Sequence, residues 1–208
     1  MITQPVFDVM AKIDRKHFVP DEMAVQAYSD IPRSIGFGTT ISAPHMHAMT
    51  LNSIKDFIIK GGKAIDIGTG SGYLGACLAE MMGKGSKVYI VDHIKEILDF
   101  AIRNIKKGNP YLMKQKRIIP ILADGRKGLK EHGPYDVIHI GGAIEEVSQE
   151  ILDQLKPGGI IWAPVGSSYS QSISIIKKDQ EGNITTDKIM DVRYGSLTSV
   201  EAQLNDSF

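Results

Sequence analysis

The chain has 208 residues, a length that fits one α/β domain. Lys and Arg total 24 and Asp and Glu total 24, so the formal charge of zero gives no argument for nucleic acid or an anionic membrane as partner. One cysteine excludes an intramolecular disulfide, and no apolar run reaches the roughly 18 residues of a membrane-spanning helix. We therefore expect a soluble, cytoplasmic monomer that binds neither nucleic acid nor membrane.

The N-terminal part combines helical spacing with irregular chain. The expected elements are a helix over 7–13, a short helix over 21–28 and a long irregular loop over 29–42. Ser42 precedes Ala43 and Pro44, so it is the predicted N-cap of a helix that runs to about Lys60.

From residue 61 onward, strand and helix patterns alternate. The expected strands lie at 64–67, 88–91, 118–122, 137–140 and 160–165, and the expected helices at 71–82, 95–105 and about 147–155. This alternation predicts an α/β fold with a Rossmann-like, doubly wound, mostly parallel sheet. Only a turn separates the strand patterns at 170–177 and 184–192, which predicts an antiparallel C-terminal hairpin at the sheet edge.

Three local features have structural interpretations. Cys77 lies in an apolar helical stretch and is expected to be a small buried residue rather than a nucleophile. The basic run at 114–117 is interpreted as a solvated connection rather than a nucleic-acid site. The turn at 155–159, between a helix and a strand, is expected to touch no ligand.

The first functional pattern is a glycine turn at 64–72, which reads Ala-Ile-Asp-Ile-Gly-Thr-Gly-Ser-Gly. Gly68 and Gly70 allow close approach of a ligand, and the helix that starts near Ser71 offers free backbone N–H groups. Asp92 ends the next strand and can accept hydrogen bonds from both ribose hydroxyls of a nucleoside. The alternative is a tight turn without a ligand.

Two details favour S-adenosylmethionine over a dinucleotide. The glycine spacing is Gly-x-Gly-x-Gly rather than Gly-x-Gly-x-x-Gly, and Asp66 inside the strand can face a cationic amino group. Asp124 and Gly125 follow the strand at 118–122, and this resembles the position at which class I methyltransferases place an acidic residue near the adenine amino group. An ordinary strand-end turn is the other interpretation of that pair.

The segment before the helix at residue 43 carries two histidines and a serine. His45 and His47 are two residues apart and would point about 200° apart on a helix, so we expect no metal site there. Besides acting as N-cap, Ser42 could help a helix start to hold an anion such as a carboxylate.

Residues 40–48, Thr-Ile-Ser-Ala-Pro-His-Met-His-Ala, resemble the marker of the protein-L-isoaspartate (D-aspartate) O-methyltransferase family of class I S-adenosylmethionine-dependent enzymes. Supporting matches lie at 66–74, 91–96, 124–126, 134–141, 154–159, Leu197-Thr198 and Gln203. The resemblance therefore runs from about residue 6 to residue 203. One departure is Gly195-Ser196, where the family often has a bulky apolar residue followed by proline.

The resemblance implies roles for individual residues. Ser42 matches the active-site serine, beside the substrate carboxylate. Together with the glycine-turn argument, the expected cofactor-binding residues are Thr39, Thr40, Ile41, Ser42, His47, Asp66, Gly68, Gly70, Ser71, Asp92, His93, Asp124, Gly125, Thr198 and Gln203. The expected substrate-binding residues are Ser42, Ala43, His45 and Ser196.

The implied reaction moves a methyl group from S-adenosyl-L-methionine to the free carboxylate of L-isoaspartyl residues, and leaves S-adenosyl-L-homocysteine. The partners would be age-damaged proteins and peptides, and the methyl ester would cyclise and partly reopen as normal aspartate. The expected single domain divides into an N-terminal substrate-side segment (1–60), a cofactor-binding core (61–166) and C-terminal edge strands (167–208). Alternatives are another class I methyltransferase, a non-catalytic nucleotide-binding protein and a nicotinamide dehydrogenase.

Overall fold

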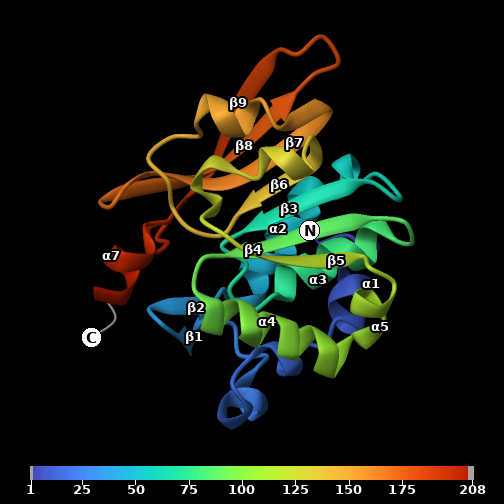
Figure 1. Ribbon diagram of the computed structural model, residues 1–208, viewed down its shortest axis with the longest axis vertical. Coiled ribbons are helices and arrows are strands. Elements are labelled where there is room, and N and C mark those ends of the chain that lie inside the picture. Colours follow the sequence, from blue (N-terminus) through green and yellow to red (C-terminus); the bar gives the residue numbers. More distant parts are fainter. Residues whose placement is uncertain (1, 206–208) are drawn as a thin grey trace.

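The computed structural model describes residues 2–205, and a seven-stranded sheet forms its centre (Figure 1). Its strands, in chain order, are β3 (Lys63–Ile67), β4 (Lys87–Asp92), β5 (Ile118–Leu122), β6 (Tyr135–Ile140), β7 (Leu155–Ser167), β8 (Ser170–Lys178) and β9 (Ile184–Val192). Their spatial order is β5-β4-β3-β6-β7-β8-β9; β3 to β7 run parallel, and β8 and β9 add antiparallel pairings. The mostly parallel sheet and the C-terminal hairpin are therefore confirmed.

The sheet separates two apolar cores because successive residues of a strand point to opposite faces. Ala64 and Ile90 belong to one core, whereas their neighbours Ile65 and Val91 belong to the other. The first face is covered by α1 (Gln4–Lys12), α2 (Pro44–Ile54), α3 (Tyr73–Met82), α4 (Lys95–Gly108) and α5 (Pro110–Lys114). The second is covered by η4 (Gly125–Lys127), η5 (Lys130–His132) and α6 (Gln149–Leu152).

The N-terminal part differs from the sequence prediction in three ways. The short helix expected over 21–28 is the 3₁₀ segment η2 (Asp21–Gln26), and another 3₁₀ segment, η1 (Arg15–Phe18), precedes it. Two short strands follow, β1 (Arg33–Gly36) and β2 (Thr39–Ile41). The irregular loop expected over 29–42 thus contains an antiparallel hairpin. Helix α2 ends at Ile54 and continues only as η3 (Lys55–Phe57), so the prediction that it runs to about Lys60 was wrong.

Ser42 is not the N-cap of α2, and that prediction was wrong. Pro44 is the first helical residue, so the capping position falls on Ala43, whose extended backbone has φ −58° and ψ 150°. The carbonyl of Ser42 instead accepts a hydrogen bond from Arg15 Nη2 at 2.7 Å. Ser42 therefore lies one residue before the N-cap of α2.

Three differences occur later in the chain. The helix expected over 147–155 is the short α6, and residues 155–159 belong to β7 rather than to a separate turn. The short helices α5 and α7 (Val200–Asn205) were not predicted. No helix within residues 2–205 has the length and apolar character needed to cross a membrane.

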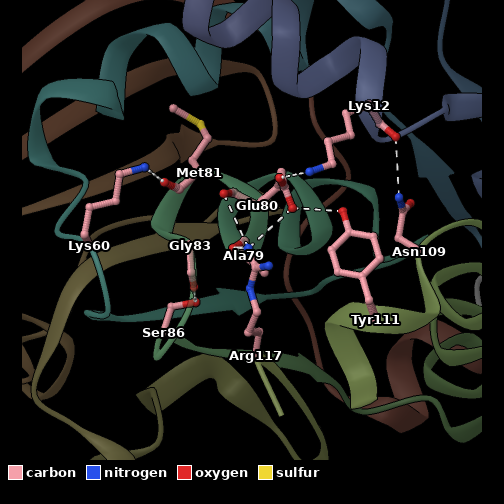
Figure 2. Close-up of polar contacts among 10 residues, drawn as sticks. All are labelled: Lys12, Lys60, Ala79, Glu80, Met81, Gly83, Ser86, Asn109, Tyr111 and Arg117. Carbon is pink, nitrogen blue, oxygen red and sulfur yellow. Dashed lines mark hydrogen bonds and ion pairs between the residues drawn. The ribbon is translucent and has the colours of Figure 1, made fainter. Parts of the chain in front are cut away.

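The basic run at 114–117 is only partly solvated, because Arg117 is 5% exposed. Its guanidinium donates to the carbonyl of Ala79 and lies 3.4 Å from the Glu80 carboxylate, at the C-terminal end of α3 (Figure 2). Glu80 also binds Lys12 and Tyr111, so this cluster joins three helices to the start of β5. Cys77, on the same helix, is buried as predicted.

Candidate active site

A cavity of about 810 Å³ lies at the carboxyl ends of the central strands, and a second one of about 40 Å³ adjoins it. The order of the sheet reverses at β3 and β6, and the crevice at such a reversal is where open α/β sheets bind ligands. The rim is completed by β2, the start of α2 and the C-terminal segment, which ends in α7 beside β1 and β2 (Figure 1).

The glycine turn after β3 shapes the floor of the larger cavity. Gly70 has a positive φ of 55°, and its N–H donates to Asp92 Oδ2 at 3.2 Å. Asp92 Oδ1 accepts from the N–H of Ile94, also at 3.2 Å. Burial raises the pKa of Asp92, which these backbone hydrogen bonds partly oppose. Its remaining acceptor capacity faces the cavity, as recognition of ribose hydroxyls requires.

Asp66 lies deeper and is 1% exposed. Its two oxygens accept from Thr69 Oγ1 and from His139 Nδ1, each at 2.7 Å. The His139 ring is stacked on Trp162, with centroids 5.0 Å apart. The sequence interpretation missed His139, although its position near the carboxyl end of β6 could have indicated it.

Gly141 was also missed, and it follows β6 directly. A Cβ at this position would lie 2.5 Å from the carbonyl oxygen of Gly68. Only glycine lets the end of β6 approach the glycine turn this closely, and the cavity wall depends on that approach. Gly141 lines both cavities.

Asp124 and Gly125 form the far rim, beyond β5. The Asp124 carboxylate is held by Arg126, which donates from Nη2 at 2.6 Å. This hydrogen bond holds the pKa of Asp124 below its usual value, so the carboxylate is an acceptor at neutral pH. Gly125 is buried behind it.

The segment that resembles the family marker separates its two histidines as the spacing predicts. His45 is exposed and its Nδ1 lies 2.8 Å from Asp30 Oδ1. His47 is 8% exposed, lines the smaller cavity and accepts a hydrogen bond from Arg15 Nη1 at 3.0 Å. Ser42 lines both cavities. No group of three or more His, Cys, Asp or Glu residues within residues 2–205 could hold a metal ion.

The C-terminal segment closes the rim. Leu197 N–H donates to the carbonyl of Ala143 at 2.8 Å, and Ala143 N–H donates to Gly195 at 2.8 Å, which places Ser196 and Thr198 on the larger cavity. Tyr194, which sequence reasoning missed, lines both cavities. Burial raises the pKa of its phenol, and a hydrogen bond with Ser42 acts in the opposite direction.

The structure brings all of the predicted site residues to one or the other cavity. Those on the larger cavity are Thr39, Thr40, Ser42, Ala43, His45, Gly68, Gly70, Asp92, His93, Asp124, Gly125, Ser196, Thr198 and Gln203. Those found only on the smaller cavity are Ile41, His47, Asp66 and Ser71. Asp92 can accept from ribose hydroxyls, Asp124 is an acceptor at the rim, and the smaller cavity is lined by buried polar side chains such as Asp66. This combination suits a nucleoside that carries an amino-acid group.

The sheet, the glycine turn and the acidic strand ends define a Rossmann-like, S-adenosylmethionine-dependent methyltransferase. A family model described as Protein-L-isoaspartate(D-aspartate) O-methyltransferase matches residues 1–202, and the chain belongs to that family.

Individual relatives agree with this assignment. A protein-L-isoaspartate O-methyltransferase 2 of Arabidopsis thaliana is 44% identical over 96% of this chain, which spans 64% of that relative's length. A protein-L-isoaspartate O-methyltransferase of Triticum aestivum is 42% identical over 99% of this chain and 88% of its own length. A crystal structure of a Plasmodium falciparum protein assigned to the same activity, in complex with S-adenosyl-L-homocysteine, has a TM-score of 0.86 and 32% identity, and the match covers 95% of this chain and 92% of that one.

Proposed function

We propose that this protein transfers a methyl group from S-adenosyl-L-methionine to the free carboxylate of L-isoaspartyl residues in proteins and peptides. The observation that carries the proposal is the position of Ser42, which borders both cavities, between the glycine turn and the open rim. The relatives named for this reaction and the membership of their family support the same substrate.

The chemistry requires orientation more than proton transfer. An isoaspartyl α-carboxylate has a pKa of roughly 3.5 and is ionised at pH 7, so it needs no general base. S-adenosylmethionine supplies a methyl group that a positively charged sulfur already activates. The task of the chain is then to align the carboxylate oxygen with that methyl group.

Ser42 is the proposed catalytic residue. A carboxylate only accepts hydrogen bonds, so the Ser42 hydroxyl must donate to it. Tyr194 lies beside Ser42, and burial, the larger influence, raises the pKa of its phenol. Ala43, His45 and Ser196 border the same part of the larger cavity and are the proposed contacts to the peptide.

The cofactor would lie along the carboxyl ends of the strands. Asp92 would accept from the ribose hydroxyls, and Asp124 with Gly125 would border the adenine. His47, Asp66 and Ser71, around the smaller cavity, would face the amino-acid end. Thr198, His93 and Gln203 would cover the nucleoside from the rim. We propose no metal for this reaction.

The test is transfer of radiolabelled methyl from S-adenosylmethionine to a peptide with one L-isoaspartyl residue, with the normal aspartyl peptide as control. Base-labile label on the isoaspartyl peptide alone is the expected result. Label on neither peptide, with S-adenosylhomocysteine still bound, would contradict the substrate and favour another class I methyltransferase. Absence of any cofactor binding would contradict the proposed function altogether.

We also infer that the protein works as a cytoplasmic monomer. The residues proposed to hold the cofactor and the peptide all lie on the two cavities of this chain. Sedimentation equilibrium at micromolar concentration tests this, and a dimer that dissociates together with activity would contradict it.

A further inference from the structure

Arg15, in η1, is a buried guanidinium that binds neutral groups. It is 3% exposed; its Nε donates to the carbonyl of Ala27 and its Nη2 to that of Ser42, both at 2.7 Å. Its Nη1 lies 3.0 Å from His47 Nδ1. The guanidinium also lies over the Tyr73 ring, 5.8 Å from the centroid. No carboxylate within residues 2–205 forms an ion pair with Arg15, so these contacts and the more distant charge of Asp30 offset the loss of water around the guanidinium.

The contact with Arg15 determines which nitrogen of His47 carries the proton. Arginine has only donors, so Nδ1 of His47 must be the acceptor. Burial, and then the positive charge of Arg15, hold the pKa of His47 well below its usual value. The ring is therefore neutral at pH 7, with its proton on Nε2.

His139 borders the same small cavity and contacts a carboxylate through its Nδ1. Its Nδ1 lies 2.7 Å from Asp66 Oδ1, and a carboxylate only accepts, so Nδ1 carries the proton. That hydrogen bond fixes the His139 ring beside Asp66. Both rings line the cavity of about 40 Å³. The Nε2–H donor of His47 on one side and the carboxylate acceptor of Asp66 on the other suit the carboxylate and ammonium groups of an α-amino acid.

We propose that Arg15 is a positioning residue: it holds His47 with the proton on Nε2, so that His47 donates to the carboxylate of the cofactor's amino-acid end, and it fixes the main chain at Ser42. This inference rests on the proposed function only in taking S-adenosylmethionine as the cofactor. Arg15 has no direct contact with either reactant in this assignment. Its effect passes through His47 Nδ1 and the Ser42 carbonyl.

A purely structural role would give a different result. Arg15 also bonds the carbonyl of Ala27, directly after η2, and that contact would hold η1 to the end of η2 whatever the tautomer of His47. A structural tie predicts a loss of stability alone. A positioning role predicts in addition a change in the protonation of one ring and in cofactor affinity.

The experiment is Arg15→Lys, compared with Arg117→Lys. Lysine keeps the charge but its single ammonium cannot serve three separated acceptors. Arg117 is a matched control, since it is 5% exposed and donates to the backbone carbonyls of Ala79 and Glu80, away from both cavities (Figure 2). Thermal unfolding of both variants gives the stability that each loses.

Two measurements decide between the roles. Nitrogen-15 NMR, with the His47 signals assigned from His47→Gln, is expected to show a neutral ring protonated on Nε2 in the unmodified protein and a tautomer mixture in Arg15→Lys. Titration calorimetry with S-adenosylhomocysteine is expected to show about tenfold weaker binding for Arg15→Lys and unchanged binding for Arg117→Lys.

Each contrary result overturns the inference. An unmodified protein with its proton on His47 Nδ1 would do so even if Arg15→Lys failed to fold. An Arg15→Lys protein that bound S-adenosylhomocysteine as tightly as Arg117→Lys would do so too. Failure to methylate the isoaspartyl peptide, with both expected shifts present, would remove the proposed substrate and leave the role of Arg15 standing.

Discussion

Gln203 of α7 accepts a hydrogen bond from His93 Nε2 at 2.6 Å, across a separation of 110 residues. Its side-chain nitrogen donates to the carbonyl of Phe37, at the tip of the β1–β2 hairpin, at 3.0 Å. One side chain thus connects the β4–α4 connection, the N-terminal hairpin and the C-terminal helix on the rim of the larger cavity.

Gln203→Ala is expected to speed release of S-adenosylhomocysteine by up to about thirtyfold, because two hydrogen bonds of about 1 kcal/mol each would be lost from the rim. Stopped-flow displacement of the bound ligand measures the rate. Gln149→Ala is the control, since the Gln149 side chain donates to Asp153 within the same helical turn and lines neither cavity. Equal release rates for the two variants would show that the bridge does not retain the ligand.

Ser42→Ala is expected to lower turnover on the isoaspartyl peptide roughly ten- to one-hundred-fold, the effect of losing one hydrogen bond to a charged group. Binding of S-adenosylhomocysteine should change less than about threefold, because the carbonyl held by Arg15 remains. Steady-state kinetics and calorimetry measure the two quantities. Ser53→Ala, which removes a hydroxyl that bonds Met49 within α2, is the control, and unchanged turnover in Ser42→Ala would exclude the assigned role.

Glu80→Gln is expected to destabilise the protein by about 1–3 kcal/mol at pH 7, because Arg117 and Lys12 lose their anion. Burial raises the pKa of Glu80, but hydrogen bonds from Lys12 and Tyr111 outweigh it and leave the folded pKa below the usual 4.5. Between the folded pKa and the usual value of 4.5, the Glu80 carboxyl therefore binds more protons in the unfolded state than in the folded state. The advantage of Glu80 is therefore complete above pH 4.5 and disappears as the pH falls through the folded pKa.

Urea unfolding of Glu80→Gln between pH 7 and pH 3.5 checks this dependence. The exposed Glu96 supplies the control, Glu96→Gln. A difference from the unmodified protein that stayed constant through the acid range would contradict the assigned charge network.

Gly195→Ala is expected to stabilise the protein by about 0.4–1 kcal/mol, because an added Cβ meets no atom within 4 Å and restricts only the unfolded chain. Gly182→Ala is the matched variant, because an added Cβ there also meets no atom within 4 Å. Gly182 has φ +92°, which strains alanine, so this variant should destabilise the protein. Chemical unfolding gives both signs. A more ordered Gly195-Ser196 segment should also lower the KM for isoaspartyl peptide about twofold, and a raised KM would argue against this segment as a peptide contact.

The strands could be predicted because each is a short apolar run between turns, and the residues at their carboxyl ends meet at one edge whatever the loop details. Asp92 and Gly70 are therefore found from local pattern. The hairpin at 33–41 escaped prediction because each of its strands is too short for alternation to be visible, and its turn contains Gly36, Phe37 and Gly38, all at positive φ.

Contacts between distant segments could not be read from pattern. Arg15 lies 32 residues before His47, and its contact depends on how η1 packs against α2. The sequence Asp14-Arg15-Lys16 looks like an ordinary charged turn. Asp14 and Lys16 do form the ion pair expected of such a turn, whereas Arg15 is buried. The resemblance to a family supplied His47 and Gln203, but it gave no reason for either position; the reasons are the Arg15 contact and the bridge to Phe37.

The bridge from Gln203 to Phe37 spans 166 residues of sequence. A ribosome makes the hairpin early and α7 only after every strand of the sheet. The sheet, the glycine turn and Asp92 are therefore all available for folding before the rim of the cavity can close. A nascent chain could bury its core while its binding site still lacked one side, so competence to retain the ligand would appear as one of the final events of synthesis.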